Sequence, residues 1–245
     1  MTSYKLTIQY VGTRYAGWQI QRNQRTVQGT LKEALGRLTG ETVSVIGAGR
    51  TDSGVHALGQ VAQIRLHKQM EARRLQRALN AILPPDIRIA SARVVPSGFH
   101  AQKQAVRKRY VYRIFNGQVL PPFLCGLVCQ VPVALDLEAM IQAAGLIVGR
   151  HDFRGFAAAS SAVKDFRRTV AVSRLVRRGR HIRYTIEADG FLHHMVRNIV
   201  GTLLEIGRGK RSPSDMIRIL ESRDRKQAGP TAPPEGLYLV KVWYR

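Results

Sequence analysis

The sequence predicts an α+β protein made of two halves, each with the element order βαββαβ. Some segments alternate apolar and polar residues, which is typical of strands, and others repeat apolar residues every three or four positions, which is typical of helices. This order of segments occurs once before the loop that contains Pro96 and Gly98 and once again after it. With 245 residues, the chain is long enough to bury a substantial hydrophobic core.

The first half begins with a strand in which Tyr4, Leu6 and Ile8 are the apolar members of an alternating pattern. Two stripes of leucine, isoleucine and alanine at helical spacing follow further along the chain. In chain order we expect a strand at 4–10, a helix around 31–38, strands at 42–48 and 58–66, a helix around 75–82 and a strand at 86–95.

The second half repeats this pattern. The tripeptide Arg178-Gly179-Arg180 is a tight-turn signal between two strands, and Pro213 suits the first position of a short helix that starts near Ser212. In chain order we expect a strand at 109–115, a helix at 136–148, strands at 169–177 and 181–189, a helix at 192–207, the short helix from 212 and a strand at 237–244.

Two such halves can join their antiparallel sheets edge to edge into one central sheet. Helices then cover one face of this sheet, and the other face is left as a cleft. We expect an N-terminal half, residues 1–103, that carries the loop around Asp52, and a C-terminal half, residues 104–245, that completes the cleft.

Basic residues greatly outnumber acidic ones, since 39 Lys and Arg stand against 16 Asp and Glu and give a net charge of +23. Of the basic residues 30 are arginine, whose planar guanidinium suits bidentate contacts with phosphate. Surface ion pairing is a weaker explanation for this composition, because pairing needs acids. The charge therefore favours a nucleic acid as partner and a basic cleft as its binding surface.

Several other classes are disfavoured. No apolar run approaches the roughly 20 residues that span a membrane, and the N-terminus lacks the apolar segment of a signal peptide, so we expect a cytoplasmic protein without a membrane partner. Cys125 and Cys129 have no second pair of ligands that would complete a zinc site, and the histidines show no metal-ligand spacing. We expect no metal.

The stretch GAGRTDSGVHA, residues 47–57, contains a single acid, Asp52. It begins like the dinucleotide-binding pattern GxGxxG, but Asp52 occupies the third glycine position and no helix follows, which disfavours a dehydrogenase. A structural alternative is a turn in which the carboxylate accepts backbone hydrogen bonds. Arg50 and the positive field favour the ionised carboxylate, which suits a nucleophile or a stabiliser of developing positive charge. We expect His56 to stabilise this turn.

The segment GRTDSGVHA, Gly49 to Ala57, resembles the active-site motif of the tRNA pseudouridine synthase A family. The resemblance covers nearly the whole chain, from YVGTRYAGWQ at 10–19 to the last strand. Three further segments resemble that family in the same order, namely KRYVYRIFN at 108–116, GFLHHMVRNIVGTLLEIGRGK at 190–210 and TAPPEGLYL at 231–239.

This resemblance implies that Asp52 is the catalytic nucleophile, that Tyr110 contacts the target uracil and that Arg197 pairs with the aspartate. It implies that Arg50 helps to flip out or hold the RNA strand. From the residues alone, Tyr110 alternates with Tyr112 like a core residue, and Arg197 could be a solvated helix arginine. A histidine pair at a helix start, as at His193 and His194, is more often structural, and we assign it no chemical role.

The resemblance further implies that uridine is isomerised at positions 38, 39 and 40 of the tRNA anticodon arm, by a homodimer without cofactor or metal. The rival interpretation is a non-catalytic RNA-binding protein of the same fold, which gives no reason for an acid inside a phosphate-attracting cleft. We expect basic residues around the predicted hairpin to contact phosphates, although such a hairpin is often merely solvated: Arg168, Arg174, Arg177, Arg178, Arg180 and Arg183.

Overall fold

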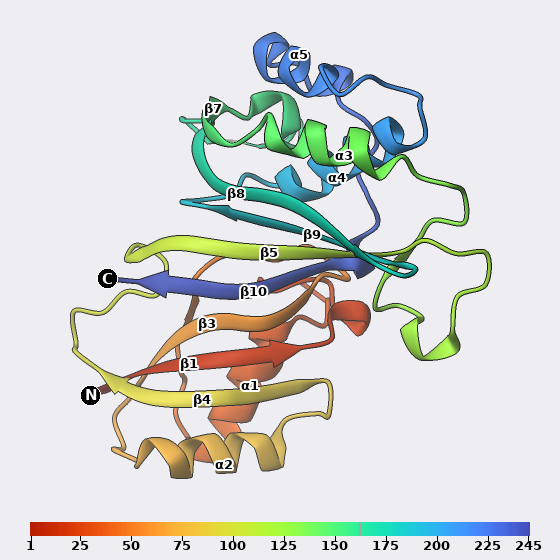
Figure 1. Cartoon of the computed structure of the whole chain (residues 1–245). Coiled ribbons are helices and arrows are strands. Elements are labelled where there is room, and N and C mark those ends of the chain that lie inside the picture. The colour runs from red at the N-terminus through yellow and green to blue at the C-terminus, as the bar shows by residue number, and fades with distance from the viewer. Residues whose placement is uncertain (162) are drawn as a thin grey trace. The chain divides into compact units, whose positions relative to one another are not determined.

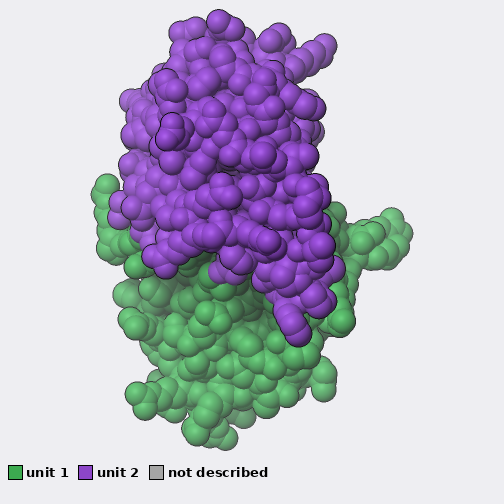
Figure 2. All heavy atoms as spheres, turned by 45° about the vertical axis from the view of Figure 1, so that its right-hand side comes forward, with its two compact units in different colours: residues 1–106, 238–245 green, residues 107–237 purple. Residues whose placement is uncertain are grey.

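The computed structural model describes residues 1–161 and 163–245. The chain forms two compact units, coloured separately in Figure 2. Unit 1 comprises Met1–Val106 and Tyr238–Arg245, and unit 2 comprises Arg107–Leu237. Each unit combines helices with a mostly antiparallel sheet, which confirms the predicted α+β class. None of the described helices is both long and apolar enough to cross a lipid bilayer.

Unit 1 has the predicted order βαββαβ. Its sheet has the strand order β4-β1-β3-β10, and β2 is added to β3. All of these pairings are antiparallel except that of β10 with β3. The elements are β1 (Thr2–Tyr10), α1 (Val27–Thr39), β2 (Val45–Gly47), β3 (His56–Leu66), α2 (Ala72–Ile82) and β4 (Ile87–Val95), with β10 (Leu237–Tyr244) returning from the far end of the sequence (Figure 1).

Local sequence explains these elements. Tyr4, Leu6 and Ile8 of β1 are fully buried, whereas the residues between them are at least partly exposed, as the alternation predicts. The hydroxyl of Thr26 caps α1 by accepting a hydrogen bond from the backbone N–H of Gly29, at 3.2 Å. The helix ends at Gly40, whose φ of 73° is readily adopted only by glycine.

Unit 2 has the strand order β5-β9-β8-β7, all antiparallel, with β6 added in parallel to β5. Its sheet is covered by helices, and α3 packs against both β8 and α4 (Figure 1). The elements are β5 (Ala105–Phe115), β6 (Cys129–Gln130), α3 (Leu137–Gly145), β7 (Gly149–Asp152), β8 (Arg167–Arg178), β9 (His181–Ala188), α4 (Met195–Gly207) and α5 (Asp215–Ser222).

Unit 2 departs from the predicted pattern in its short elements. The strands β6 and β7 were not predicted, because two and four residues are too few to show an alternation. The helix α4 begins at Met195 instead of Leu192, because His194 has a left-handed φ of 61° that interrupts helical geometry. The helix α3 ends at Gly145, before the predicted residue 148, and the chain enters β7 at Gly149 with a φ of 113°.

The helix α4 is the centre of unit 2, and most of its residues are buried. A Cβ atom built on Gly201 would overlap the carbonyl oxygen of Pro230. This glycine therefore lets the segment before β10 lie directly on the helix backbone. The side chain of Thr202 next to it donates to the carbonyl of Asn198 and accepts from the backbone N–H of Gly229, at 2.9 Å each.

Replacing Gly201 with alanine will destabilise the protein by about 2 kcal/mol or more, because the overlap with Pro230 outweighs the better helix propensity of alanine. The matched control is Gly145→Ala in α3, where a Cβ atom meets nothing within 4 Å. This control will be neutral or stabilising by up to about 1 kcal/mol. Urea unfolding of the two variants and the parent measures the difference, and equal stabilities for both variants would contradict the packing argument.

Candidate active site

The loop that carries Asp52 connects β2 to β3, and we call residues 48–55 the Asp52 loop. Its backbone is fixed at both ends. The N–H of Trp18 donates to the carbonyl of Thr51 at 3.0 Å, and the N–H of Gly54 donates to the carbonyl of Tyr15 at 3.3 Å. The Asp52 loop therefore lies against residues 12–18, which come from the segment between β1 and α1.

Glycines make this backbone contact possible. Gly17 has a φ of 93°, and a Cβ atom built on it would lie 2.6 Å from the carbonyl oxygen of Thr51. A Cβ atom on Gly12 would overlap the carbonyl oxygen of Val55. Because neither position can accept a side chain without movement, the direction of the Asp52 loop is set by close contact between backbones.

A buried hydrogen bond joins the Asp52 loop to β1. The hydroxyl groups of Tyr10 and Thr51 lie 2.7 Å apart, and both residues are buried. Burial raises the pKa of Tyr10 well above its ordinary range, so the phenol stays neutral. Next to Thr51, Asp52 is only half-buried and Arg50 is exposed, so this part of the loop is accessible to solvent.

His56 is the first residue of β3 and directly follows the Asp52 loop. Its Nδ1 accepts a hydrogen bond from the backbone N–H of Gly12 at 3.0 Å. Its ring stacks on Tyr238 of β10, with centroids 4.6 Å apart and an interplanar angle of 25°. This buried histidine therefore joins Gly12, in the segment that lies against the Asp52 loop, to the last strand of unit 1.

Unit 2 carries Tyr110 and Arg197. Tyr110 lies on β5 opposite Ile186 of β9, and only 7% of its surface is exposed. Its ring makes an edge-on contact with Phe191, with centroids 4.9 Å apart. The high burial agrees with the expected core-like alternation, and a base could reach this ring only at its small exposed part.

Arg197 is not a solvated helix arginine. It is half-buried on α4, and its Nε donates to the carbonyl of Ala232 at 2.7 Å. The backbone N–H of Ala232 donates back to the carbonyl of Arg197 at 3.0 Å. These two hydrogen bonds fix the guanidinium on the segment that contains the TAPPEGLYL sequence.

A hydrogen-bond network behind Arg197 was not predicted from the sequence. The amide of Asn198 donates to the carbonyl of Phe156 at 2.8 Å, and its Oδ1 accepts from Thr231 at 2.7 Å and from Arg225 at 3.1 Å. The hydroxyl of Tyr112 donates to the carbonyl of Pro233 at 2.8 Å. Asn198, Tyr112, Thr231 and Pro233 lie inside the segments quoted for the resemblance, which is the signal that could have identified them, whereas Phe156 and Arg225 lie outside.

The arginines that we predicted to contact phosphates lie on both faces of the hairpin formed by β8 and β9. The pairs Arg174–Thr185, Val176–Arg183 and Arg178–His181 share one face, so their arginines point to the same side. All three arginines are exposed. Arg177 points to the other side and donates from Nε to the carbonyl of Gly179 at 2.9 Å, and Arg168 lies near Gly190 at the opposite end of β8.

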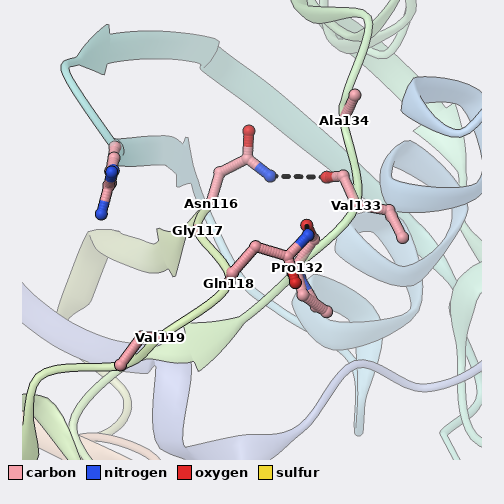
Figure 3. A pocket seen from close by; sticks show the side chains of 8 residues that line it. Asn116, Gly117, Gln118, Val119, Pro132, Val133 and Ala134 are labelled. Atoms are coloured by element: carbon pink, nitrogen blue, oxygen red, sulfur yellow. Dashed lines mark hydrogen bonds between the residues drawn. The ribbon is translucent and has the colours of Figure 1, made fainter.

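Arg180 in the turn of this hairpin lines a pocket of about 380 Å³ (Figure 3). Asn116 also lines the pocket, and its amide donates to the carbonyls of Val131 and Val133, at 2.8 and 2.7 Å. The other lining groups are short loop residues without an acid, a thiol or a histidine. The pocket therefore has no catalytic group of its own.

Asp52 and Arg50 belong to unit 1, and Tyr110 and Arg197 belong to unit 2. The structure brings Asp52 and Arg50 together in one loop. It places Arg197 beside Ala232, and Tyr110 beside Phe191. The constellation of all four residues remains a prediction.

Comparison with known proteins identifies relatives along the whole chain. A family model described as tRNA pseudouridine synthase matches residues 6–102 and 143–245. A tRNA pseudouridine synthase A of Acetivibrio thermocellus is 47% identical over 244 residues and covers 100% of both chains. The proteins of the same name from Rhodopseudomonas palustris and Myxococcus xanthus are 44% and 43% identical, and cover 100% of this chain and 100% and 93% of their own.

Among solved structures, a chain from a Cbf5-Nop10-Gar1 complex covers 96% of this chain and 57% of its own, with a TM-score of 0.39 and 11% sequence identity. At that score the likeness supports no conclusion about fold or function.

Replacing Tyr10 with phenylalanine will lower the free energy of unfolding by about 1–2 kcal/mol, because the hydroxyl of Thr51 loses its buried partner. The variant Thr51→Val will have a similar effect. Combining them will cost less than the sum, with a coupling of about 1 kcal/mol, since both changes remove the same hydrogen bond. Urea unfolding of the four proteins measures this coupling, and strictly additive effects would show that the bond does not support the loop.

Proposed function

Because the chain belongs to the tRNA pseudouridine synthase A family of isomerases, we propose that it isomerises uridine at positions 38, 39 and 40 of the tRNA anticodon arm. Asp52 is the nucleophile in this proposal. The observation that carries it is the Asp52 loop, a rigid backbone structure that presents one half-buried carboxylate in an otherwise basic segment. No redox group is needed, because substrate and product are isomers.

The reaction exchanges one bond for another. The bond between uracil N1 and ribose C1′ breaks, and a bond between uracil C5 and ribose C1′ forms, while C5 loses a proton and N1 gains one. An ionised Asp52 can add to ribose C1′ as uracil departs, or it can add to the base. In both routes the bond to Asp52 is temporary, and the carboxylate is regenerated at the end.

The other site residues have supporting roles in this proposal. Tyr110 provides an aromatic ring for the target uracil and a hydroxyl that can move a proton near C5. A guanidinium has five N–H donors, of which Arg197 uses its Nε–H on Ala232. Its remaining donors suit a charge-assisted pair with the carboxylate of Asp52.

The substrate must leave its stack before it reacts, which costs a few kcal/mol. In our proposal this energy comes from phosphate contacts, to which the exposed arginines Arg174, Arg178 and Arg183 contribute from one face of the hairpin. Arg50 is exposed and lies two residues before Asp52, so it suits a contact with the strand around the flipped nucleotide. On the family resemblance alone, we also propose that the protein is a cytoplasmic homodimer.

The variant Asp52→Asn will lose turnover by at least about 10³-fold and still bind tRNA, because an amide matches the carboxylate in shape but is not a nucleophile. Release of tritium from uracil C5 of tRNA measures turnover, and filter binding measures affinity. The control is Asp165→Asn, a surface acid that pairs with Arg167 at 3.0 Å, which will remain active. Undiminished turnover of Asp52→Asn would overturn the proposed function and favour an RNA-binding role.

We predict the effect of replacing Arg174, Arg178 and Arg183 together with glutamine. The slope of log K against log salt concentration for tRNA binding will become shallower by roughly 2, because fewer phosphate contacts form and fewer counterions are released on binding. The control replaces three arginines that form ion pairs with carboxylates, namely Arg167, Arg218 and Arg223. Titrations at several salt concentrations compare the slopes. An equal change in both triple variants would contradict a specific role for the hairpin face.

A further inference from the structure

Two cations lie close together on the face of unit 2 that carries Tyr110. Lys108 lies two residues before Tyr110 on β5, so the two side chains share a face. Lys108 is opposite Ala188 of β9, and Ala188 is opposite Val170 of β8. These strands are neighbours in the sheet (Figure 1). Arg168 lies two residues before Val170 and so projects from the same face.

The position of Arg168 is well defined. Its Nη1 donates to the carbonyls of Asp165 and Arg167, at 3.0 and 2.6 Å. Its Nε and Cδ pass Gly190 so closely that a Cβ atom built there would lie 3.1 and 3.3 Å from them. The absence of a side chain at Gly190 thus lets the Arg168 side chain pass close to the backbone.

The acids of this region are engaged elsewhere. The carboxylate of Asp165 pairs with Arg167, and that of Asp189 accepts from the backbone N–H of Thr169, at 3.0 Å each. Glu187 points to the opposite face of the sheet, where it pairs with Arg109 and Arg107. Within residues 1–161 and 163–245, no carboxylate forms an ion pair with Lys108 or Arg168.

This arrangement is unfavourable for the protein alone. Burial lowers the pKa of the Lys108 ammonium, and the positive charge of Arg168 lowers it further. Two partly desolvated charges of the same sign repel each other. The pKa of the exposed Asp165 carboxyl is lowered mainly by its hydrogen bonds from Arg167 and only in small part by the charge of Arg168, so this acid compensates Arg168 weakly. No carboxylate of the described residues forms an ion pair with Lys108. A bound anion would relieve both effects, because it would restore a partner to the ammonium and to the guanidinium.

We propose that Lys108 and Arg168 form a binding site for one backbone phosphate of the RNA, next to the nucleotide whose base contacts Tyr110. Two residues along a strand advance about 6.4–6.8 Å, which suits a base on Tyr110 and a flanking phosphate on Lys108. This inference rests on the proposed function. It gives Arg168 a different role from that of the hairpin arginines Arg174, Arg178 and Arg183. The hairpin face binds phosphates for affinity, whereas this site fixes the position of the reacting nucleotide.

The test uses the full-length protein and anticodon stem-loop RNAs in which one phosphate, 5′ or 3′ of the target uridine, is replaced by an uncharged methylphosphonate. Turnover is followed by tritium release, and affinity is followed by filter binding. The variants are Lys108→Met and Arg168→Met, with Lys108→Arg as the conservative change. The control is Arg150→Met, an exposed arginine of β7 in the same unit.

We expect one of the two methylphosphonates to weaken binding by the parent about tenfold, as for loss of a charge-assisted contact. Lys108→Met will bind the natural RNA about tenfold more weakly and will lose little more with that methylphosphonate. Lys108→Arg will retain the phosphate dependence, and Arg150→Met will behave like the parent. Without RNA, Lys108→Met will be at least as thermally stable as the parent, because it relieves the repulsion.

The inference is overturned if both methylphosphonates weaken Lys108→Met as much as the parent, or if Lys108→Met binds RNA like Arg150→Met. A lower melting temperature of Lys108→Met together with unchanged phosphate dependence would show a structural role and also overturn it. Failure of the proposed function would look different. In that case the parent would make no pseudouridine in the natural RNA, whereas the binding measurements would still report on the phosphate.

Discussion

Close contact between backbones is the constraint on which both halves of the candidate site depend. In unit 1, Gly12 and Gly17 let residues 12–18 lie directly on the Asp52 loop. In unit 2, Gly201 lets the segment around Ala232 lie directly on α4, and this segment holds Arg197. Atoms in a backbone contact change position less than atoms at the ends of long side chains. Such contacts are therefore suited to fixing a reacting group within a fraction of an ångström.

The sequence predicts most of the fold, because strands such as β1 and helices such as α2 show their periodicity over many residues. It does not predict β6 or β7, which are too short for a period, or the start of α4, which depends on the left-handed backbone of His194. In the candidate site, Asp52 stands out because it is a lone acid in a basic segment. Buried hydrogen-bonding partners such as Asn198 and Arg225 carry no such signal.

The arginines of this chain differ in their surroundings and in the roles that these surroundings allow. Some satisfy the protein's own carbonyl groups, as when Nη1 of Arg88 donates to Leu83, Pro84 and Ile87 at the end of α2. Others, such as Arg174 and Arg183, are exposed along one face of a hairpin. The net charge of +23 therefore overstates the charge available to a ligand, and the position of each guanidinium decides its role.

The strand β10 has a consequence for how the protein is made. It pairs with β3 through Tyr238 opposite His56, although these residues are far apart in the sequence. Residues 1–106 alone therefore leave an edge of β3 unpaired, and residues 238–245 cover this edge. Since synthesis runs from the N-terminus, unit 1 cannot be completed until residues 238–245 have been made, so a chain that lacks them exposes an edge prone to aggregation.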